Sequence, residues 1–187
     1  MKISSCVRCG FSLLRNVFLK LKHGEKYTCP LIMSCPISSH IEVNKGGELH
    51  IGAHLSAQRN LVLTVRQKAT VYIGKNVQFN YDCILVSRQS IKIGNNVLFG
   101  PGCKIYDHDH DYTKLGKERR ENFVSDDIII GNGCWFGADC IILKGTKIGD
   151  NCVFGAGSII HGEYADNMVI VQKKDIITKS ITYLHKE

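Results

Sequence analysis

A six-residue alternation of large and small apolar positions runs through residues 130–160. Each block of six opens with a large aliphatic or aromatic residue and carries a small side chain at its fifth position. The large positions are Ile130, Phe136, Ile142, Ile148, Phe154 and Ile160, and the small ones are Cys134, Cys140, Thr146, Cys152 and Ser158. A hexapeptide period is typical of a parallel β-helix, in which each block supplies one short strand and a corner. The pattern therefore predicts an all-β solenoid with the large residues inside.

The spacing of Ile-Gly pairs indicates how many blocks make one coil. The pairs that begin at Ile130 and Ile148 are separated by three whole blocks, which corresponds to a three-sided coil. Earlier pairs begin at Ile51, Ile73 and Ile93. The intervals between these earlier pairs are longer than three blocks, so we expect the extra residues to form bulged corners around 66–68 and 88–90.

The segment before the repeat follows a different period. Residues 10–23 alternate apolar and basic side chains as an amphipathic helix does, and this stretch is too short to span a membrane. Such a helix commonly covers the open end of a solenoid; alternatively, a basic amphipathic helix can lie on a membrane surface. We therefore divide the chain into a cap at 1–40, a repeat domain at 41–170 and a tail at 171–187.

The repeat is interrupted once, after Ile105. The interruption opens on the most histidine-rich stretch of the chain, Asp107-His108-Asp109-His110. A polar, charged loop follows at about 111–127 before the repeat resumes. A loop of this length leaving a tight solenoid is more often functional than structural, so we expect a site where the loop begins.

Charge and cysteine usage narrow the possible partners. The formal net charge of +7 favours an anionic partner, although ordinary scatter in net charge is the alternative explanation. No nucleic-acid-binding motif accompanies the charge, so we expect no nucleic-acid partner, and a polyanionic small molecule fits the charge as well. Five of the nine cysteines occupy the small position of the repeat, where free cysteine acts as a small hydrophobic residue. This usage is typical of a reducing compartment and predicts a cytoplasmic protein with no metal framework.

Residues from about 41 to 170 resemble the hexapeptide-repeat acyltransferases, and most nearly the sugar and polysaccharide O-acetyltransferases related to the galactoside and maltose acetyltransferases. Asn80 precedes His110 by the same interval that separates the asparagine from the catalytic histidine of that family. The four-residue run that ends at His110 is similar to the end of the family's catalytic hexad. Trp135, followed by Gly-Ala-Gly-Ser at 155–158, stands where the family binds the coenzyme A arm.

The resemblance implies a left-handed β-helix, a homotrimer with active sites between subunits, and direct acetyl transfer from acetyl-CoA to a sugar or glycan hydroxyl without a metal. It implies His110 as the general base, with Asn80 binding the hydroxyl or the oxyanion. Asp107 and Asp109 would orient the imidazole, bind the acceptor or only finish a turn, and Trp135 would line the groove. The implied coenzyme-binding residues are Gly137, Ala138, Gly155, Ala156, Lys173 and Lys174. The glycines among them are equally expected as corner residues.

Two departures from the family bear on its ligands. Gln172 and Lys174 replace the Gly and Pro of the closing motif, so phosphates of the coenzyme would meet lysines there instead. Arg88 stands where the galactoside and maltose branch has an aspartate, so we expect a different acceptor.

Three other functions stay open at the level of sequence. One is an N-acyltransferase acting on an amino-sugar nucleotide, and another is a non-catalytic structural trimer. The third is a zinc enzyme of the carbonic-anhydrase kind, which would need three converging histidines. Its candidate ligands are His54, His108, His110 and His161.

Overall fold

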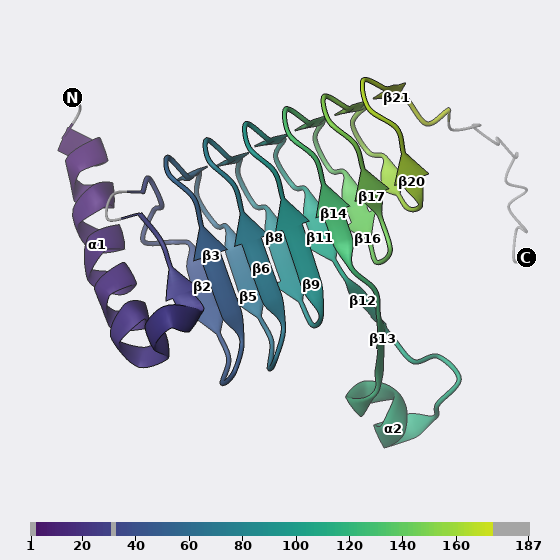
Figure 1. The fold of residues 1–187 in the computed structure, drawn as a ribbon, viewed down its shortest axis with the longest axis horizontal. Helices are drawn as coiled ribbons and strands as arrows, with labels where there is room; N and C mark the ends of the chain where they lie inside the picture. Colours follow the sequence, from purple (N-terminus) through teal and green to yellow (C-terminus); the bar gives the residue numbers. More distant parts are fainter. Residues whose placement is uncertain (1–2, 31–32, 174–187) are drawn as a thin grey trace, which may run out of the picture.

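The computed structural model describes residues 3–30 and 33–173, and in it the chain winds into a three-sided parallel β-helix (Figure 1). The predicted all-β solenoid is confirmed. Each coil contributes one strand to each of three parallel sheets, in the order third, first and second sheet along the chain. The first sheet consists of β1 (Tyr27–Thr28), β3 (Glu48–Ile51), β6 (Thr70–Ile73), β9 (Ser90–Ile93), β14 (Ile128–Ile130), β17 (Lys147–Ile148) and β20 (Glu163–Tyr164).

The other two sheets run along the solenoid in the same way. The second sheet consists of β4 (Ser56–Ala57), β7 (Gln78–Phe79), β10 (Leu98–Phe99), β15 (Trp135–Phe136), β18 (Val153–Phe154) and β21 (Val169–Ile170). The third sheet consists of β2 (His40–Val43), β5 (Val62–Val65), β8 (Ile84–Ser87), β11 (Lys104–Tyr106), β16 (Ile141–Leu143) and β19 (Ile159–Ile160). Because every strand pairs with its equivalent one coil away, a side chain at one repeat position lies directly over its equivalents.

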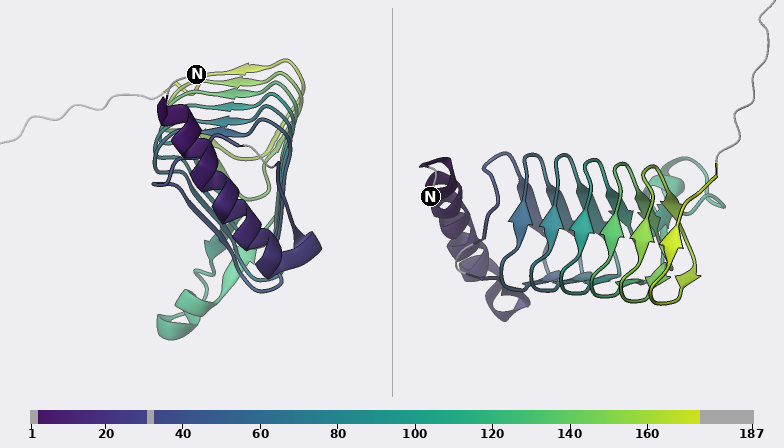
Figure 2. Two further views of the ribbon diagram at one scale, coloured as in Figure 1. Left: turned by 90° about the vertical axis from the view of Figure 1, so that its left-hand side faces the viewer. Right: turned by 90° about the horizontal axis from the view of Figure 1, so that it is seen from above.

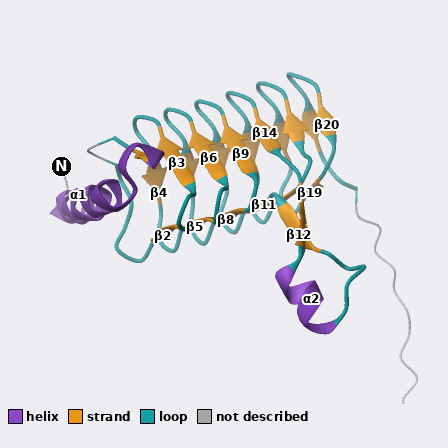
Figure 3. Ribbon diagram, turned by 60° about the horizontal axis from the view of Figure 1, so that its bottom comes forward, coloured by secondary structure: helices purple, strands orange, loops and turns teal. Residues whose placement is uncertain are grey.

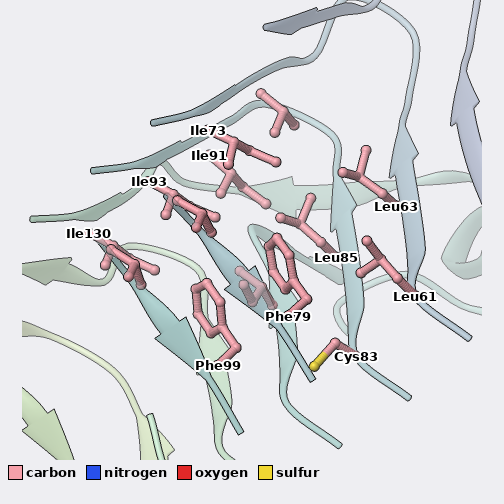
Figure 4. Packing of buried hydrophobic residues seen from close by; sticks show 14 of the residues in the cluster. Leu61, Leu63, Ile73, Phe79, Cys83, Leu85, Ile91, Ile93, Phe99 and Ile130 are labelled. Carbon is pink, nitrogen blue, oxygen red and sulfur yellow. The ribbon is translucent and has the colours of Figure 1, made fainter. Parts of the chain in front are cut away.

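The interior is built from the large positions of the repeat. Phe79, Phe99, Phe136 and Phe154 are buried and stack in a column, with ring centroids 4.8, 4.9 and 5.1 Å apart. This separation equals the spacing of neighbouring strands, so the coil rise itself sets the stacking. Figure 4 shows Phe79 and Phe99 side by side beneath the neighbouring aliphatic residues.

The small positions also point inward, as predicted, and their thiols have a second role. Cys103 Sγ lies 3.2 Å from the carbonyl oxygen of Gly137, and Cys140 Sγ lies 3.3 Å from that of Gly155. Both cysteines are buried and free. A thiol therefore fills the narrow corner and donates to a carbonyl of the next coil, which a purely apolar residue of the same size cannot do.

The N-terminal helix α1 (Ile3–His23) lies across the open end of the solenoid (Figure 2) and begins earlier than the predicted 10–23. The short 3₁₀ helix η1 (Gly24–Lys26) leads from it into β1. The Ser12 hydroxyl donates to the Met33 carbonyl at 2.8 Å, and the Tyr27 hydroxyl donates to Asn16 Oδ1 at 2.9 Å. Leu19 is buried in the core, so α1 covers the first coil with one face. No helix among the described residues is long and apolar enough to cross a membrane.

Two kinds of corner matter for the site. The corner between the third and first sheets, called here the arm corner, holds residues 44–47, 66–69 and 88–89 in successive coils. The extra residues of the early coils lie there, close to where the spacing predicted them. The corner between the second and third sheets is called here the Asn80 corner, after the residue that follows β7.

The interruption of the repeat forms an arm at residues 107–127 that projects from the arm corner (Figure 3). Its strands β12 (His108–His110) and β13 (Phe123–Ser125) pair antiparallel, and α2 (Gly116–Glu121) sits at its tip. The sequence predicted that the loop starts at about position 111, but the excursion already begins at position 107. His108 and His110 belong to the arm because β12 pairs with β13 and leaves the coil.

Candidate functional site

Asp107 fixes the arm to the solenoid. The side chain is fully buried, and its carboxylate accepts hydrogen bonds from Ser87 Oγ at 2.6 Å and from the backbone N–H groups of Arg88 at 2.8 Å and Gln89 at 2.9 Å. Burial raises the pKa of Asp107, but hydrogen bonds from His108, Ser87 and the backbone outweigh burial and hold the net pKa below its usual value. The expectation that Asp107 binds the acceptor is wrong, because a carboxylate enclosed in this way has no surface to offer a ligand.

His108 is held between Asp107 and two aromatic side chains, Tyr106 of β11 and Phe123 of the arm. Its Nδ1 atom lies 3.0 Å from Asp107 Oδ1. Its ring meets Tyr106 and Phe123 edge-on, with centroids 6.3 and 5.6 Å apart. The imidazole that the aspartate orients is therefore that of His108, and this pair reinforces the root of the arm.

His110 is exposed at the end of β12. Its Nδ1 atom lies 2.9 Å from the backbone carbonyl oxygen of Arg119 in α2, and its ring rests on Phe123 with centroids 4.4 Å apart. A carbonyl oxygen only accepts, so Nδ1 carries the proton of the neutral imidazole and Nε2 keeps its lone pair. The arm thus presents a histidine in the tautomer that a general base requires.

Asp109 lies on the outer surface of the arm. Its Oδ2 atom lies 3.5 Å from Lys144 Nζ, which belongs to the next coil. Both groups are accessible, so the pair contributes little stability, and Asp109 remains available to a ligand.

Phe123 joins His110 to a cationic side chain of the solenoid. The guanidinium carbon of Arg88 lies 3.3 Å from the centroid of the Phe123 ring, within the range of a cation–π contact. Phe123 was missed as a site residue by sequence reasoning. The available signal was an aromatic side chain near the end of an otherwise polar, charged loop.

Asn80 lies at the Asn80 corner, where the strands of the third sheet begin, whereas the arm leaves the corner where these strands end. Together with Gln78, Leu98, Gly100 and the half-exposed Trp135, it lines a small pocket of about 140 Å³. The pocket opens on the outer face of the second sheet, and Trp135 forms one of its walls, as an outward-pointing residue of the repeat should.

The chain does not bring Asn80 and His110 together. They lie at opposite corners of the third sheet, and a four-residue strand such as β8 spans roughly 13 Å. The arm carries His110 further out. The sequence interval that matches the family therefore places the two side chains on different edges of one subunit.

The predicted coenzyme-binding residues gather at the Asn80 corner. Gly137 and Ala138 follow β15, and Gly155 and Ala156 follow β18, one coil further along. Backbone hydrogen bonds tie these corners together, from Gly137 N to Phe154 O at 2.8 Å and from Gly157 N to Ala138 O at 2.7 Å. The result is a stripe of small residues that continues from Asn80 toward the C-terminal end.

Two further predictions concern charge and metal. Lys173 is exposed at the end of the described chain, whereas Lys174 lies outside the described residues. Within residues 3–30 and 33–173, no group of three His, Cys, Asp or Glu side chains is arranged to hold a metal ion.

Comparison with known proteins supports the architecture of the repeat. Residues 127–162 match the family model described as bacterial transferase hexapeptide (six repeats). The galactoside O-acetyltransferase of Escherichia coli K12 is 35% identical over 103 residues, which cover 54% of this chain and 49% of the relative. The chain thus spans about half the length of that enzyme.

A second relative is similar over nearly its whole length. The putative lipopolysaccharide biosynthesis O-acetyl transferase WbbJ of Escherichia coli K12 is 27% identical over 172 residues, which cover 87% of this chain and 84% of the relative. A solved N-acyltransferase, AntD from Bacillus cereus, matches with a TM-score of 0.59 and 18% identity, over 80% of this chain and 81% of that chain. This last likeness shows the fold alone. The hexapeptide period and the three-sided coil of this chain agree with the repeat that the family model describes at residues 127–162.

Proposed function

We propose that the protein transfers an acetyl group from acetyl-CoA to a hydroxyl group of a sugar or glycan precursor, with His110 as the general base. The observation that carries the proposal is the hydrogen bond between His110 Nδ1 and the Arg119 carbonyl, which leaves Nε2 able to take a proton. The names of the two O-acetyltransferase relatives favour the same reaction.

His110 performs the chemistry in one direct transfer. Its Nε2 removes the proton of the acceptor hydroxyl while that oxygen attacks the thioester carbon. A C–O bond forms, the oxyanion collapses, the C–S bond breaks, and the imidazolium returns the proton to the departing thiolate. Phe123 keeps the ring in place during both proton transfers, because it packs against the imidazole face. No covalent enzyme intermediate is needed, since binding both substrates in one groove supplies the orientation.

The proposed active form is a homotrimer in which His110 of one subunit faces Asn80 of a neighbouring subunit. The separation of the two residues within one chain supports this arrangement. The outer face of the second sheet supports it as well, because Leu98, Trp135 and Val169 lie in one register column and are all exposed. Such an apolar column fits a groove between subunits better than open solvent.

Acetyl-CoA is proposed to lie along the Asn80 corner. Its pantetheine chain would follow the stripe formed by Gly137, Ala138, Gly155 and Ala156, where small residues let a ligand approach the backbone closely. Lys173 and Lys174 would meet its phosphates as point charges. We place the protein in the cytoplasm, where acetyl-CoA is made and where thiols stay reduced.

The outward face of α1 is proposed to touch a membrane surface. Leu14, Phe18 and Leu21 are 71%, 63% and 82% exposed, and they lie on one helical face. Residues 1–24 contain no acidic side chain. An exposed apolar stripe with only basic charges around it is typical of helices that bind anionic lipid.

Calorimetry with acetyl-CoA, followed by an assay of thiol release with sugar acceptors, tests the proposed reaction. We expect micromolar binding with one site per chain and thiol release that depends on the acceptor. Absence of coenzyme binding would leave a structural trimer as the better interpretation.

A further inference from the structure

Two arginines lie one above the other at the arm corner. Val65 pairs with Ser87 in the third sheet, so the residues that follow them, Arg66 and Arg88, are equivalents in successive coils. Neighbouring strands are about 4.8 Å apart. Asn44 precedes Arg66 in the same column, because its N–H donates to the Val65 carbonyl at 2.9 Å.

These side chains line a pocket of about 370 Å³ together with Gln67. The Nε atoms of Arg66 and Arg88 are buried and have no hydrogen-bond partner. None of the ion pairs in the described part of the chain includes either guanidinium. Two cations therefore share a pocket whose lining contains no carboxylate.

This arrangement is costly without a ligand. Like charges on adjacent strands repel each other, and a buried donor without a partner loses its hydration without compensation. Burial and the charge of Arg66 lower the pKa of Arg88, and the nearby charge of Asp107 offsets them only in part. An anion in the pocket removes both costs, and the fork of a guanidinium matches a carboxylate or phosphate in geometry.

The pocket adjoins the proposed base. Arg88 lies over one ring, Phe123, and His110 rests on that same ring. The Arg88 guanidinium carbon and the His110 ring centroid are therefore no further apart than the sum of 3.3 and 4.4 Å. A single saccharide unit is long enough to bridge such a distance.

The positive surface continues from this pocket toward the cap. A second pocket of about 570 Å³ shares Asn44 with the first and is lined by Lys22, Lys26 and Lys45. Its one carboxylate, Glu42, accepts a hydrogen bond from Asn44 Nδ2 at 2.7 Å. The basic lining is therefore only partly neutralised within the chain.

We infer that the acceptor is an anionic saccharide, whose carboxylate or phosphate binds Arg66 and Arg88 while a hydroxyl of the same or the next residue reaches His110. Only the contact between the acceptor hydroxyl and His110 rests on the proposed acetyl transfer; the binding of an anion by Arg66 and Arg88 does not. Phosphates of the coenzyme are the other possible source of an anion, but they are assigned to Lys173 and Lys174 after β21, whereas Arg66 and Arg88 follow β5 and β8 in earlier coils.

Binding of matched sugar pairs tests the anion site without any turnover. The probes are p-nitrophenyl β-D-glucuronide against the glucoside, glucose 1-phosphate against methyl glucoside, and inorganic phosphate. We expect the wild type to bind the anionic member of at least one pair on the order of 10- to 100-fold more tightly, as a charged hydrogen bond provides. Arg66→Gln should abolish that preference, since Arg66 lines the pocket.

Lys68→Gln is the matched control. It removes the same charge from the same corner, but Lys68 is exposed and does not line the pocket. The control should keep the preference for the anion. Equal binding of anionic and neutral partners by the wild type, failure to bind any anionic probe, or an unchanged preference in Arg66→Gln would each overturn the inference.

Turnover and coenzyme binding separate this inference from the proposed function. Calorimetry with acetyl-CoA should give the same affinity for wild type and Arg66→Gln, because the coenzyme does not use the arginine pocket. A loss of coenzyme affinity in that variant would assign the arginines to coenzyme phosphates and overturn the inference. If no acceptor, anionic or neutral, gives thiol release, the proposed acetyl transfer is contradicted. The anion site is then judged from the binding experiments alone.

Discussion

The Nδ1 atom of His110 lies 2.9 Å from the backbone carbonyl oxygen of Arg119, so the helix at the tip of the arm fixes the tautomer of the histidine at the outer end of β12. The arm therefore holds the His110 imidazole in one orientation. Because the orienting group is a carbonyl rather than a carboxylate, the imidazolium formed during transfer gains no full charge partner from Arg119.

His110→Ala is expected to lower kcat by about 10³-fold, because the acceptor hydroxyl loses its base. Acetyl-CoA affinity should stay unchanged, since the proposed coenzyme contacts come from the stripe of small residues and the lysines after β21, whereas His110 acts on the acceptor hydroxyl. His161→Ala serves as the control, because His161 is exposed and has no part in the proposed transfer. Thiol release is measured for the wild type and both variants. A near-normal kcat in His110→Ala would exclude His110 as the general base.

Asp107→Asn is expected to destabilise the fold by about 2–4 kcal/mol at pH 7, because an amide cannot accept all the hydrogen bonds that converge on the carboxylate. The folded-state pKa of Asp107 is depressed below its unfolded value of 3.8. Its stabilisation is thus fully present well above pH 3.8 and is lost as the pH falls through the lower folded pKa.

Thermal unfolding of wild type and Asp107→Asn between pH 7 and pH 2 checks this linkage. The gap between their melting temperatures should be constant near neutrality and should narrow below about pH 4. A gap that does not depend on pH would mean that the carboxylate charge contributes nothing to folding.

The interior of the solenoid was predictable because one period controls it. A residue such as Phe99 has the same neighbours in every coil, so its burial follows from its place in the hexad. The bulged corners were predictable for the same reason. The strands on either side keep their place in the repeat, so extra residues between them must lie in the corner. Handedness was not, because a coil of three hexads suits either hand and only the resemblance implied one.

The arm was harder to predict because it leaves the period. His110 and Phe123 meet only through a three-residue antiparallel pairing, which leaves too short an alternation to recognise. The burial of Asp107 depends on hydrogen bonds from the backbone N–H groups of Arg88 and Gln89. Every residue except proline has such a group, so the sequence does not indicate which of them will meet a carboxylate. The arginine pocket arises from register between coils, so Arg88 alone suggested only a changed acceptor.

Gly94→Ala is expected to destabilise the solenoid by about 1–3 kcal/mol. A Cβ at this position would lie 2.7 Å from the backbone carbon of Gly131 and 2.8 Å from the backbone nitrogen of Asn132, so one coil would have to move. Gly10→Ala is the matched control, because its Cβ would meet nothing within 4 Å and alanine favours the helix. Denaturant unfolding of both variants measures the difference, and equal stabilities would show that the coils can separate without cost.

Phe18→Ser combined with Leu21→Ser is expected to abolish binding to anionic vesicles while leaving the fold intact. Both side chains are exposed on α1, so their loss removes apolar area from the lipid contact and none from the core. Ile37→Ser is the control, since Ile37 is equally exposed but lies outside the helix. Co-sedimentation with phosphatidylglycerol vesicles should recover wild type and control but not the double variant, and high salt should weaken the binding because Lys20 and Lys22 flank the apolar stripe. Equal sedimentation of the double variant would mean that α1 only covers the first coil.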